Sequence, residues 1–498
     1  HHQLCRIEYA YENIHFPESA EALDLARRRL AFEELFLFTI GLERLRSRRE
    51  VVHVPPCGGV DMELFYRALP FTLTDAQRRC VEEALADMRS GTPMNRLCQG
   101  DVGSGKTMVA AACVYFMVKN GRQAALMAPT EILAQQHYQG LAPLLENLGI
   151  RCALLTGSTT AKTKRSITQQ LESGEIDFAI GTHALITGSV AYRDLGLVVT
   201  DEQHRFGVAQ RAELAAKGDH PHILVMSATP IPRTLALILY GDLDVSIIDQ
   251  LPPGRQPVQT FAVTGGYHQR VYRFIRKLVG EGRQAYIVCP MVEENDQLPD
   301  ERKAVTEYAK KLQSEVFPDL KVAFVHGKMK PKEKDAVMAA FAAHETDILV
   351  STTVIEVGVD VPNAAVMVIE NAERFGLSQL HQLRGRVGRG KHQSYCILIS
   401  DNRNEETRQR LKVMTKTTDG FQIAEEDLRL RGPGDFFGAR QHGLPGLKVA
   451  DLGCDTQLLQ EARQAAEQLL AQDPALTSCP ATAERVTELF TQQADALN

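Results

Sequence analysis

Short apolar runs alternate with amphipathic stretches over two consecutive parts of the chain. Between about residues 95 and 250 the runs are 96–99, 124–128, 152–156, 178–181, 197–200 and 222–226. Between about residues 258 and 400 they are 258–263, 285–288, 322–325, 347–351, 366–370 and 395–399. Apolar runs of this length, separated by stretches with helical periodicity, are typical of βαβ units around a parallel sheet. The pattern therefore predicts an α/β fold with two parallel-sheet lobes in tandem.

The two ends of the chain carry a different, helical pattern. Apolar residues recur at helical spacing from 20 to 44, and Ser19 is placed to cap that helix. The stretch 55–59 (PPCGG) breaks the chain, and 251–257 (LPPGRQP) is a candidate linker. The region beyond about residue 401 is charged and punctuated by glycine. We expect four parts, which are a helical segment over 1–70, a first lobe over 71–255, a second lobe over 256–405 and a helical C-terminal region over 406–498.

Composition is that of an ordinary globular protein. The 498 residues are 44% hydrophobic and 24% charged, and the length is about three times that of one domain. The apolar run 109–118 is too short to span a bilayer, so no membrane segment is expected. The formal charge of −6 argues against a coat of positive charge, and the arginines at 27–29 and 44–49 fit a solvated helix face best, although a local basic groove stays open. Ten scattered cysteines without metal-like spacing indicate free thiols in a reducing, cytosolic compartment and no zinc site.

One segment at the end of the first apolar run matches the phosphate-binding pattern G-x-x-x-x-G-K-[ST]. Residues 100–107 read GDVGSGKT and open an Ala/Val-rich helical stretch. Glycines in such a loop let backbone N–H groups wrap phosphates, with the lysine on the β- and γ-phosphates and the threonine hydroxyl on Mg²⁺. The predicted nucleotide-binding residues are Gly100, Gly103, Ser104, Gly105, Lys106 and Thr107.

Two further segments carry charge where a nucleotide site would use it. Asp201 and Glu202 directly follow the run 197–200, and open α/β sheets bind ligands at the carboxyl ends of their strands. Asp201 can therefore hold Mg²⁺, and Glu202 can orient and deprotonate an attacking water. Residues 382–389 read QLRGRVGR, and arginine suits bidentate phosphate contacts and the charge of a transition state. A site gripped by one lobe and completed by arginines of the other is typical of a motor.

The order of these motifs resembles that of superfamily 2 helicases of the DExH type, whose two lobes are RecA-like. Residues 201–204 (DEQH) resemble the box after which the type is named, and Gln77 resembles the adenine-reading glutamine of the Q motif. The remaining matches are 128–131 for motif Ia, 181–183 for Ib, 227–230 for III, 325–327 for IV, 352–360 for V and 382–389 for VI.

The resemblance implies a role for each matching residue, with ATP and Mg²⁺ bound between the lobes. The catalytic residues would be Lys106, Asp201, Glu202, Arg386 and Arg389. The metal ligands would be Thr107 and Asp201. Further contacts to the nucleotide would come from Gln77, Asp360 and Gln382. The nucleotide state would be relayed by His204, Ser227 and Thr229. The phosphates of DNA would be gripped by Thr130, Thr182 and Thr352.

Other segments resemble one family in particular, the RecG branched-DNA translocases. Residues 201–208 read DEQHRFGV, 430–435 read LRGPGD and 438–441 read GARQ. The stretch from about 408 to 441 is similar to a helical hairpin shared by RecG and the transcription-repair coupling factor Mfd. There an arginine pair and a glutamine couple motor closure to a loop that pushes on duplex DNA. The matching positions are Arg410, Arg431 and Gln441.

Membership of this family would make the chain an ATP hydrolase and DNA helicase. It would translocate on double-stranded DNA at stalled forks and Holliday junctions, in recombination and repair. The resemblance also implies a monomer in the bacterial cytoplasm, with branched DNA as its partner and a single-stranded DNA-binding protein as a further one.

One part of the family pattern is missing from the sequence. RecG proteins normally carry an N-terminal wedge, an OB fold that splits the fork, whereas residues 1–70 resemble the connection between wedge and motor. The chain is expected to be either a fragment or a motor-only form, which leaves junction specificity open. An Mfd-like translocase, an RNA helicase and a remodelling scaffold with an ATPase switch are the alternatives. The box DEQH disfavours an Mfd-like translocase, since Mfd usually has DEEQ there. The stretch 431–441 favours a DNA translocase over an RNA helicase.

Overall fold

A computed structural model of the chain describes most of its residues. The described ranges are 4–47, 52–201, 208–228, 243–252, 256–290, 301–327, 329–352, 361–390, 392–431, 447–451 and 455–491. The chain divides into two compact units. The first unit comprises residues 1–51, 231–244 and 424–498, and the second comprises 52–230 and 245–423. The second unit holds both sheets and the candidate site.

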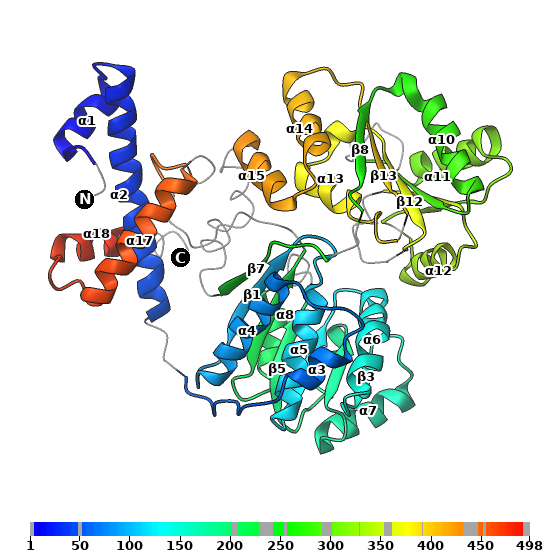
Figure 1. Cartoon of the computed structure of the whole chain (residues 1–498), viewed down its shortest axis with the longest axis horizontal. Helices are drawn as coiled ribbons and strands as arrows, with labels where there is room; N and C mark the ends of the chain where they lie inside the picture. The colour runs from blue at the N-terminus through cyan, green and yellow to red at the C-terminus, as the bar shows by residue number, and fades with distance from the viewer. Residues whose placement is uncertain are drawn as a thin grey trace. The chain divides into compact units, whose positions relative to one another are not determined.

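Lobe 1, within the described residues, is built on a seven-stranded sheet of order β3-β4-β2-β5-β6-β1-β7 (Figure 1). The strands are β1 (Asn95–Gly100), β2 (Gln123–Met127), β3 (Cys152–Leu155), β4 (Phe178–Gly181), β5 (Leu195–Thr200), β6 (His222–Ser227) and β7 (Asp244–Ile248). Neighbouring strands from β3 to β1 are parallel. The helices are α3 (Glu63–Ala68), α4 (Asp75–Arg89), α5 (Lys106–Lys119), α6 (Glu131–Glu146), α7 (Ala161–Ser173), η1 (His183–Ile186) and α8 (Val208–Ala215).

The central strands of lobe 1 are apolar without interruption because helices cover both faces of the sheet. Leu126 and Leu197 pack with residues of α4, α5 and α6 on one face. The next residues along the same strands, Met127 and Val198, pack with residues of α7, η1 and α8 on the other. Helix α5 begins at the phosphate loop and lies in this core, and its run of small residues from 110 to 112 is fully buried.

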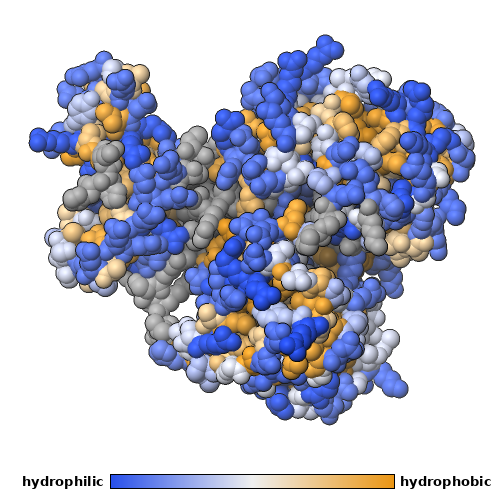
Figure 2. Space-filling view, viewed as in Figure 1, coloured by the Kyte–Doolittle hydropathy of each residue, from blue (hydrophilic) through white to orange (hydrophobic). Residues whose placement is uncertain are grey.

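Lobe 2 contains, among the described residues, a six-stranded parallel sheet of order β10-β11-β9-β12-β13-β8 (Figure 1). The strands are β8 (Gln259–Val263), β9 (Gln284–Val288), β10 (Val322–Val325), β11 (Ile348–Ser351), β12 (Ala364–Ile369) and β13 (Tyr395–Ile399). The helices are η3 (Gly265–Tyr267), α10 (His268–Gly280), α11 (Glu301–Lys311), η4 (Leu312–Val316), α12 (Pro331–Ala342), η6 (Ala372–Arg374), α13 (Leu377–Arg384), α14 (Glu405–Lys416) and α15 (Gly420–Arg431). Hydrophobic surface is visible over lobe 2 near the edge strand β8 (Figure 2), where Phe261 is 48% exposed.

The fold class predicted from the apolar runs is confirmed. Each of the twelve runs coincides with a strand to within a residue or two, and the two sets fall into two separate parallel sheets. Strand β7 was not expected. Its sequence, DVSII, alternates between buried and partly exposed positions at the sheet edge and so lacks a continuous apolar run.

The first unit is a group of helices around the long helix α2 (Ala20–Ser47), with α1 (Ile7–His15), α17 (Thr456–Gln472) and α18 (Pro480–Thr491) against it. Ser19 caps α2 as expected, since its Oγ accepts the Ala22 N–H at 3.1 Å. The side chains of Arg27 and Arg28 are 41% and 39% exposed, as a solvated face requires, and both also form ion pairs. Arg27 makes a bidentate ion pair with Asp455 at 2.9 and 3.0 Å, and Arg28 lies 2.6 Å from Glu461. These arginines therefore join α2 to the C-terminal helices. Across the described residues, no helix is both long and apolar enough to cross a bilayer.

Candidate nucleotide-binding site

The phosphate loop joins the end of β1 to the start of α5. Gly103 and Gly105 have φ angles of +77° and +84°, a left-handed conformation that favours glycine. A Cβ added at Gly105 would lie 2.2 Å from Nε2 of Gln77, so a side chain there has no room. The N–H groups in the first turn of α5 have no acceptor within the helix and carry its positive dipole end. The loop is thus built to hold an anion by its backbone.

The Lys106 side chain is folded along this loop. Its Nζ donates to the carbonyl oxygens of Gly100 at 2.7 Å and Asp101 at 2.9 Å, and Ser104 Oγ is 3.5 Å away. The side chain is buried but still reaches the cleft described below. The two carbonyls hold the ammonium group at the mouth of the loop, where a phosphate could replace them as its partner.

Gln77 lies directly behind the loop and bridges it to the preceding helix. Its Oε1 accepts the Thr74 N–H at 2.9 Å, and the Thr74 hydroxyl accepts the Gln77 N–H at 3.2 Å, which completes a capping box at the start of α4. Its Nε2 donates to the carbonyl oxygen of Ser104 at 2.7 Å. Both ends of this buried amide therefore bind the protein itself. The role of Gln77 in reading adenine stays a prediction.

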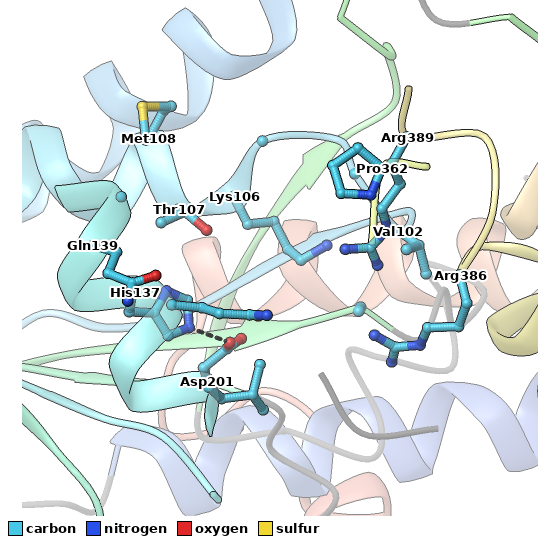
Figure 3. A pocket seen from close by; sticks show the side chains of 16 residues that line it. Val102, Lys106, Thr107, Met108, His137, Gln139, Asp201, Pro362, Arg386 and Arg389 are labelled. Carbon is cyan, nitrogen blue, oxygen red and sulfur yellow. Dashed lines mark hydrogen bonds and ion pairs between the residues drawn. The ribbon is translucent and has the colours of Figure 1, made fainter. Parts of the chain in front are cut away.

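Asp201 lies at the carboxyl end of β5, where the sequence places it. Its N–H donates to the Met127 carbonyl at 3.1 Å, and its Oδ2 is 2.7 Å from Nε2 of His137 on α6 (Figure 3). Asp201 and Thr107 line the same cleft. Sequence reasoning missed His137. The available signal was the spacing from the start of α6. Thr130 caps that helix, and His137 lies seven residues later, on the same helix face.

Lobe 2 contributes two arginines to this cleft. Arg386 and Arg389 follow α13, and both line the space of about 540 Å³ that Lys106, Thr107 and Asp201 also line. Figure 3 shows the two guanidinium groups and the Lys106 ammonium pointing into this common space. Nε of Arg389 donates to the carbonyl oxygen of Gly385 at 3.1 Å, and this hydrogen bond restrains the Arg389 side chain. Among the described residues that line the cleft, the charged groups are thus Lys106, Arg386, Arg389 and the Asp201 carboxylate.

The donors in the cleft fit a magnesium ion that is held jointly with phosphate. Thr107 Oγ1 and the Asp201 carboxylate are hard oxygen donors, and Mg²⁺ is usually bound by one or two protein groups together with substrate phosphates and water. Within the described ranges, no group of three or more His, Cys, Asp or Glu side chains is placed to hold a metal without such help.

The other predicted residues are distributed over both lobes. Thr130 caps α6 by accepting the Leu133 N–H at 3.3 Å, and Ser227 is buried at the end of β6. The hydroxyls of Thr182 and Thr352 are buried at strand ends with no hydrogen-bond partner in the described part of the chain. Gln382 lies on α13 and is not among the cleft-lining residues. The predictions for Glu202, His204, Thr229, Asp360 and Gln441, and for the Arg431 side chain, lie outside what the structure describes.

Arg410, predicted as a coupling residue, lies on α14. Its NH2 donates to the carbonyl oxygen of Glu373 at 2.9 Å. Glu373 is in η6, just before α13, so this bond ties α14 to the segment that leads into the arginine run.

Sequence models of three families match parts of the chain. The DEAD/DEAH box helicase model matches residues 74–238, and the helicase conserved C-terminal domain matches 268–391. The model for domain 3, C-terminal, of the ATP-dependent DNA helicase RecG matches 417–489. The three matches follow the order of lobe 1, lobe 2 and the C-terminal helices.

Individual relatives decide the family. The ATP-dependent DNA helicase RecG of Bacillus subtilis is 50% identical over 93% of this chain and 68% of its own length. The chain belongs to the RecG family. RecG of Synechocystis is 52% identical over 96% of this chain, and RecG of Thermotoga maritima is 51% identical over 94%. The predicted resemblance to RecG is confirmed, and the Mfd-like alternative is set aside. The chain spans 58% and 60% of the lengths of these last two relatives.

A solved structure supports the same assignment. A RecG bound to a three-way DNA junction is 48% identical, with a TM-score of 0.73 over 92% of this chain and 60% of that one. The helicase MrfA, bound to DNA and a nucleotide analogue, matches with a TM-score of 0.53 at 16% identity, which shows only that the two-lobed fold is shared.

Proposed function

We propose that this chain is an ATP-dependent DNA helicase and double-stranded DNA translocase that acts on branched DNA in recombination and repair. The observation that carries the proposal is the cleft in which Lys106 and Asp201 of lobe 1 face Arg386 and Arg389 of lobe 2. When a site is split between two lobes, a change of its ligand can change the distance between the lobes. A motor requires such a change of distance. The name of the junction-bound RecG relative supports branched DNA as the substrate.

ATP is the proposed substrate, and each lobe has a distinct task in its hydrolysis. The loop amides and Lys106 bind the β- and γ-phosphates, and Thr107 and Asp201 would hold Mg²⁺, which would neutralise charge on the phosphate oxygens. Glu202 takes a proton from the attacking water. As the bond from the γ-phosphorus to the bridging oxygen breaks, Arg386 and Arg389 stabilise the charge that develops there.

His137 adds a positioning task on the lobe 1 side. Its ring nitrogen is 2.7 Å from one oxygen of Asp201, so it fixes the direction of that carboxylate. Asp360 and Gln382 remain proposed contacts to the nucleotide, and Gln77 remains the proposed reader of adenine.

Contacts to DNA are proposed at the strand ends. Thr182 and Thr352 are the proposed phosphate contacts. Their hydroxyls have no hydrogen-bond partner within the described part of the chain, and because both are buried, a phosphate would reach them only after the strand ends open. Thr130 is proposed to act with them, and His204, Ser227 and Thr229 to relay the nucleotide state. Coupling to movement is assigned to Arg410, Arg431 and Gln441. The chain is proposed to work as a monomer in the bacterial cytoplasm, as its relatives are bacterial, with a single-stranded DNA-binding protein as a further partner.

Steady-state ATP hydrolysis tests the proposal, measured without nucleic acid and with linear duplex DNA, single-stranded DNA, a four-way junction or duplex RNA. Strong stimulation by duplex and junction DNA, with little by RNA, is expected. Equal stimulation by junction and linear duplex would leave a DNA motor without branch specificity. Stimulation by RNA alone, or by no nucleic acid, would refute the proposed function.

A further inference from the structure

The side chain of Asp101, the second residue of the phosphate loop, reaches lobe 2. Its Oδ1 accepts the Val102 N–H at 2.6 Å and lies 2.5 Å from Nε2 of His381 on α13. Its Oδ2 accepts the N–H of Gly420, the first residue of α15, at 3.2 Å. One carboxylate of the loop thus contacts two helices of lobe 2, α13 and α15.

The hydrogen bonds around His381 determine its tautomer. NH2 of Arg384 lies 2.9 Å from Nδ1 of His381, and a guanidinium can only donate. Nδ1 is therefore the acceptor, and the proton of the neutral ring is on Nε2. His381 consequently donates to Asp101, and the three side chains form a chain of bonds with a single direction from Arg384 to Asp101.

The far end of this chain holds the C-terminus of α14. NH1 of Arg384 donates to the carbonyl oxygens of Met414 and Thr417, both at 2.9 Å. Carbonyls at a helix C-terminus lack partners within the helix, so a buried arginine is a strong ligand for them. The turn between α14 and α15 is therefore held at both ends, by Arg384 at residues 414 and 417 and by Asp101 at residue 420.

Two of the three side chains are buried and the Asp101 side chain is 15% exposed, so water competes little for these bonds. His381 is 4% exposed and Arg384 is 3% exposed. Burial acts to raise the pKa of Asp101, but the hydrogen bonds from His381 and Val102 and the charge of Lys106 outweigh it and lower that pKa, so the group stays a carboxylate.

The near end of the chain is linked to phosphate binding through Lys106. The carbonyl of Asp101 is one of the two oxygens that hold the Lys106 ammonium. A phosphate that draws Lys106 away releases that carbonyl, so the backbone that carries the Asp101 side chain is free to change its position. The far end is linked to movement, because α15 ends at Arg431, one of the proposed coupling residues.

We propose that Asp101, His381 and Arg384 form a relay that transmits the arrangement of the phosphate loop to the turn between α14 and α15. This inference rests on the proposed function and adds to it a route that does not pass through Arg386 or Arg389. The three are positioning residues. They set where α15 starts relative to the loop, and they do not touch the reacting atoms.

The test uses two variants of His381 in the full chain. His381→Leu fills the space but removes both hydrogen bonds. His381→Gln keeps a donor for Asp101 and is the conservative variant. Arg408→Ala is the matched control, since Arg408 lies on the exposed face of α14 and pairs with Glu405 at 3.7 Å. Thermal unfolding first establishes that each variant is folded.

Two measurements are made on each folded variant. The first is the rate of triplex displacement divided by the rate of ATP hydrolysis, which reports movement per ATP. His381→Leu is expected to lower this ratio by about tenfold, with kcat and KM for ATP changed much less, since couplings between sites are commonly of this size. His381→Gln should recover part of the ratio, and Arg408→Ala should match the unaltered chain. An unchanged ratio in His381→Leu, or equal losses of hydrolysis and movement, overturns the relay.

The second measurement is hydrogen exchange at residues 417–423, with and without ADP and beryllium fluoride. Nucleotide should change the protection of this turn in the unaltered chain and in Arg408→Ala, but not in His381→Leu. This readout needs only nucleotide binding. A chain that binds nucleotide and shows the response, yet does not move along DNA, would contradict the proposed function and leave the relay supported. An identical response in His381→Leu overturns the relay, whatever the motor does.

Discussion

The buried amide of Gln77 allows its two suggested roles to be separated by one substitution. Gln77→Ala removes the bond to the Ser104 carbonyl and the bond to the Thr74 N–H. If Gln77 mainly supports the phosphate loop, every nucleotide should be affected. If it mainly reads the base, only adenine nucleotides should be.

The expected loss of stability follows from the surroundings of the two bonds. Ser104 is fully buried, so its carbonyl loses a hydrogen bond and gains no water, which costs about 1–3 kcal/mol. Thr74 is only half-buried at a helix start, and losing its partner there adds about 0.5–1 kcal/mol. Gln77→Ala should therefore lower the free energy of unfolding by about 1.5–4 kcal/mol, less than the 5–15 kcal/mol typical of a domain. The chain should stay folded.

Gln77→Glu isolates the loop bond from the cap. A glutamate at this helix position still accepts the Thr74 N–H, as in an ordinary capping box. Its ionised carboxylate has no hydrogen to give the Ser104 carbonyl, which is 2.7 Å from the present nitrogen. Gln77→Glu should keep the cap but impair the loop as much as Gln77→Ala does.

Urea unfolding and the values of kcat/KM for ATP and GTP provide the assay. Loop support predicts that both substitutions lower kcat/KM by about tenfold for both nucleotides, which corresponds to about 1.4 kcal/mol of transition-state stabilisation. A loss confined to ATP would refute loop support and establish adenine reading. A change in unfolding free energy below about 0.5 kcal/mol would refute the assignment of the two bonds themselves.

Three further predictions concern the cleft and the core of lobe 1. Lys106→Ala should abolish ATP hydrolysis while leaving the circular dichroism spectrum unchanged, and retained turnover would contradict the site. Arg389→Ala should lower kcat by about a thousandfold, as expected for an arginine that stabilises the transition state, with a much smaller change in nucleotide Kd measured by fluorescence; equal losses would make it a binding residue only. Burial lowers the pKa of His222 to about 4, below the ~6.5 of an unfolded chain. The neutral ring therefore contributes fully to the free energy of unfolding above pH 6.5. That contribution is lost as pH falls towards 4, by up to about 3 kcal/mol. His222 Nδ1 accepts the Met94 N–H at 2.9 Å, and His222→Asn keeps an acceptor for it. This variant should flatten that part of the pH dependence of the unfolding free energy measured in urea. An unchanged slope would contradict the assignment to His222.

The fold was largely predictable because its strands are buried on both faces. Such strands are continuous apolar runs, so β2, β4 and β5 were visible without knowledge of their partners. Strand β7 lies at the sheet edge, and its alternating exposure gives no such signal. The order of strands in each sheet depends on which runs pair, and that information is not local in the sequence.

The site was predictable only where its parts are contiguous. The eight residues of the phosphate loop form one local structure, so their pattern in the sequence is enough to predict the geometry of the loop. The capping box of Thr74 and Gln77 was also readable from its spacing, although the sequence interpretation gave Gln77 another task. His137 and Asp201 are 64 residues apart, and Asp101 and His381 are 280 apart. No local pattern marks such pairs, because folding alone brings them together.

The arginine run at residues 382–389 contributes side chains to two different places, the end of α14 and the cleft. Helix α13 ends at Arg384, whose side chain turns inward to the end of α14, while Arg386 and Arg389 lie beyond the helix and face the cleft. Gly385 separates the two groups, and a Cβ there would lie only 2.9 Å from the Cβ of Val102 in the phosphate loop. The backbone of the run thus packs directly on the loop whose ligand its outer arginines are proposed to contact. A ligand-dependent movement of that loop would therefore press on the backbone at Gly385, from which the inner arginine extends on one side and the outer arginines on the other.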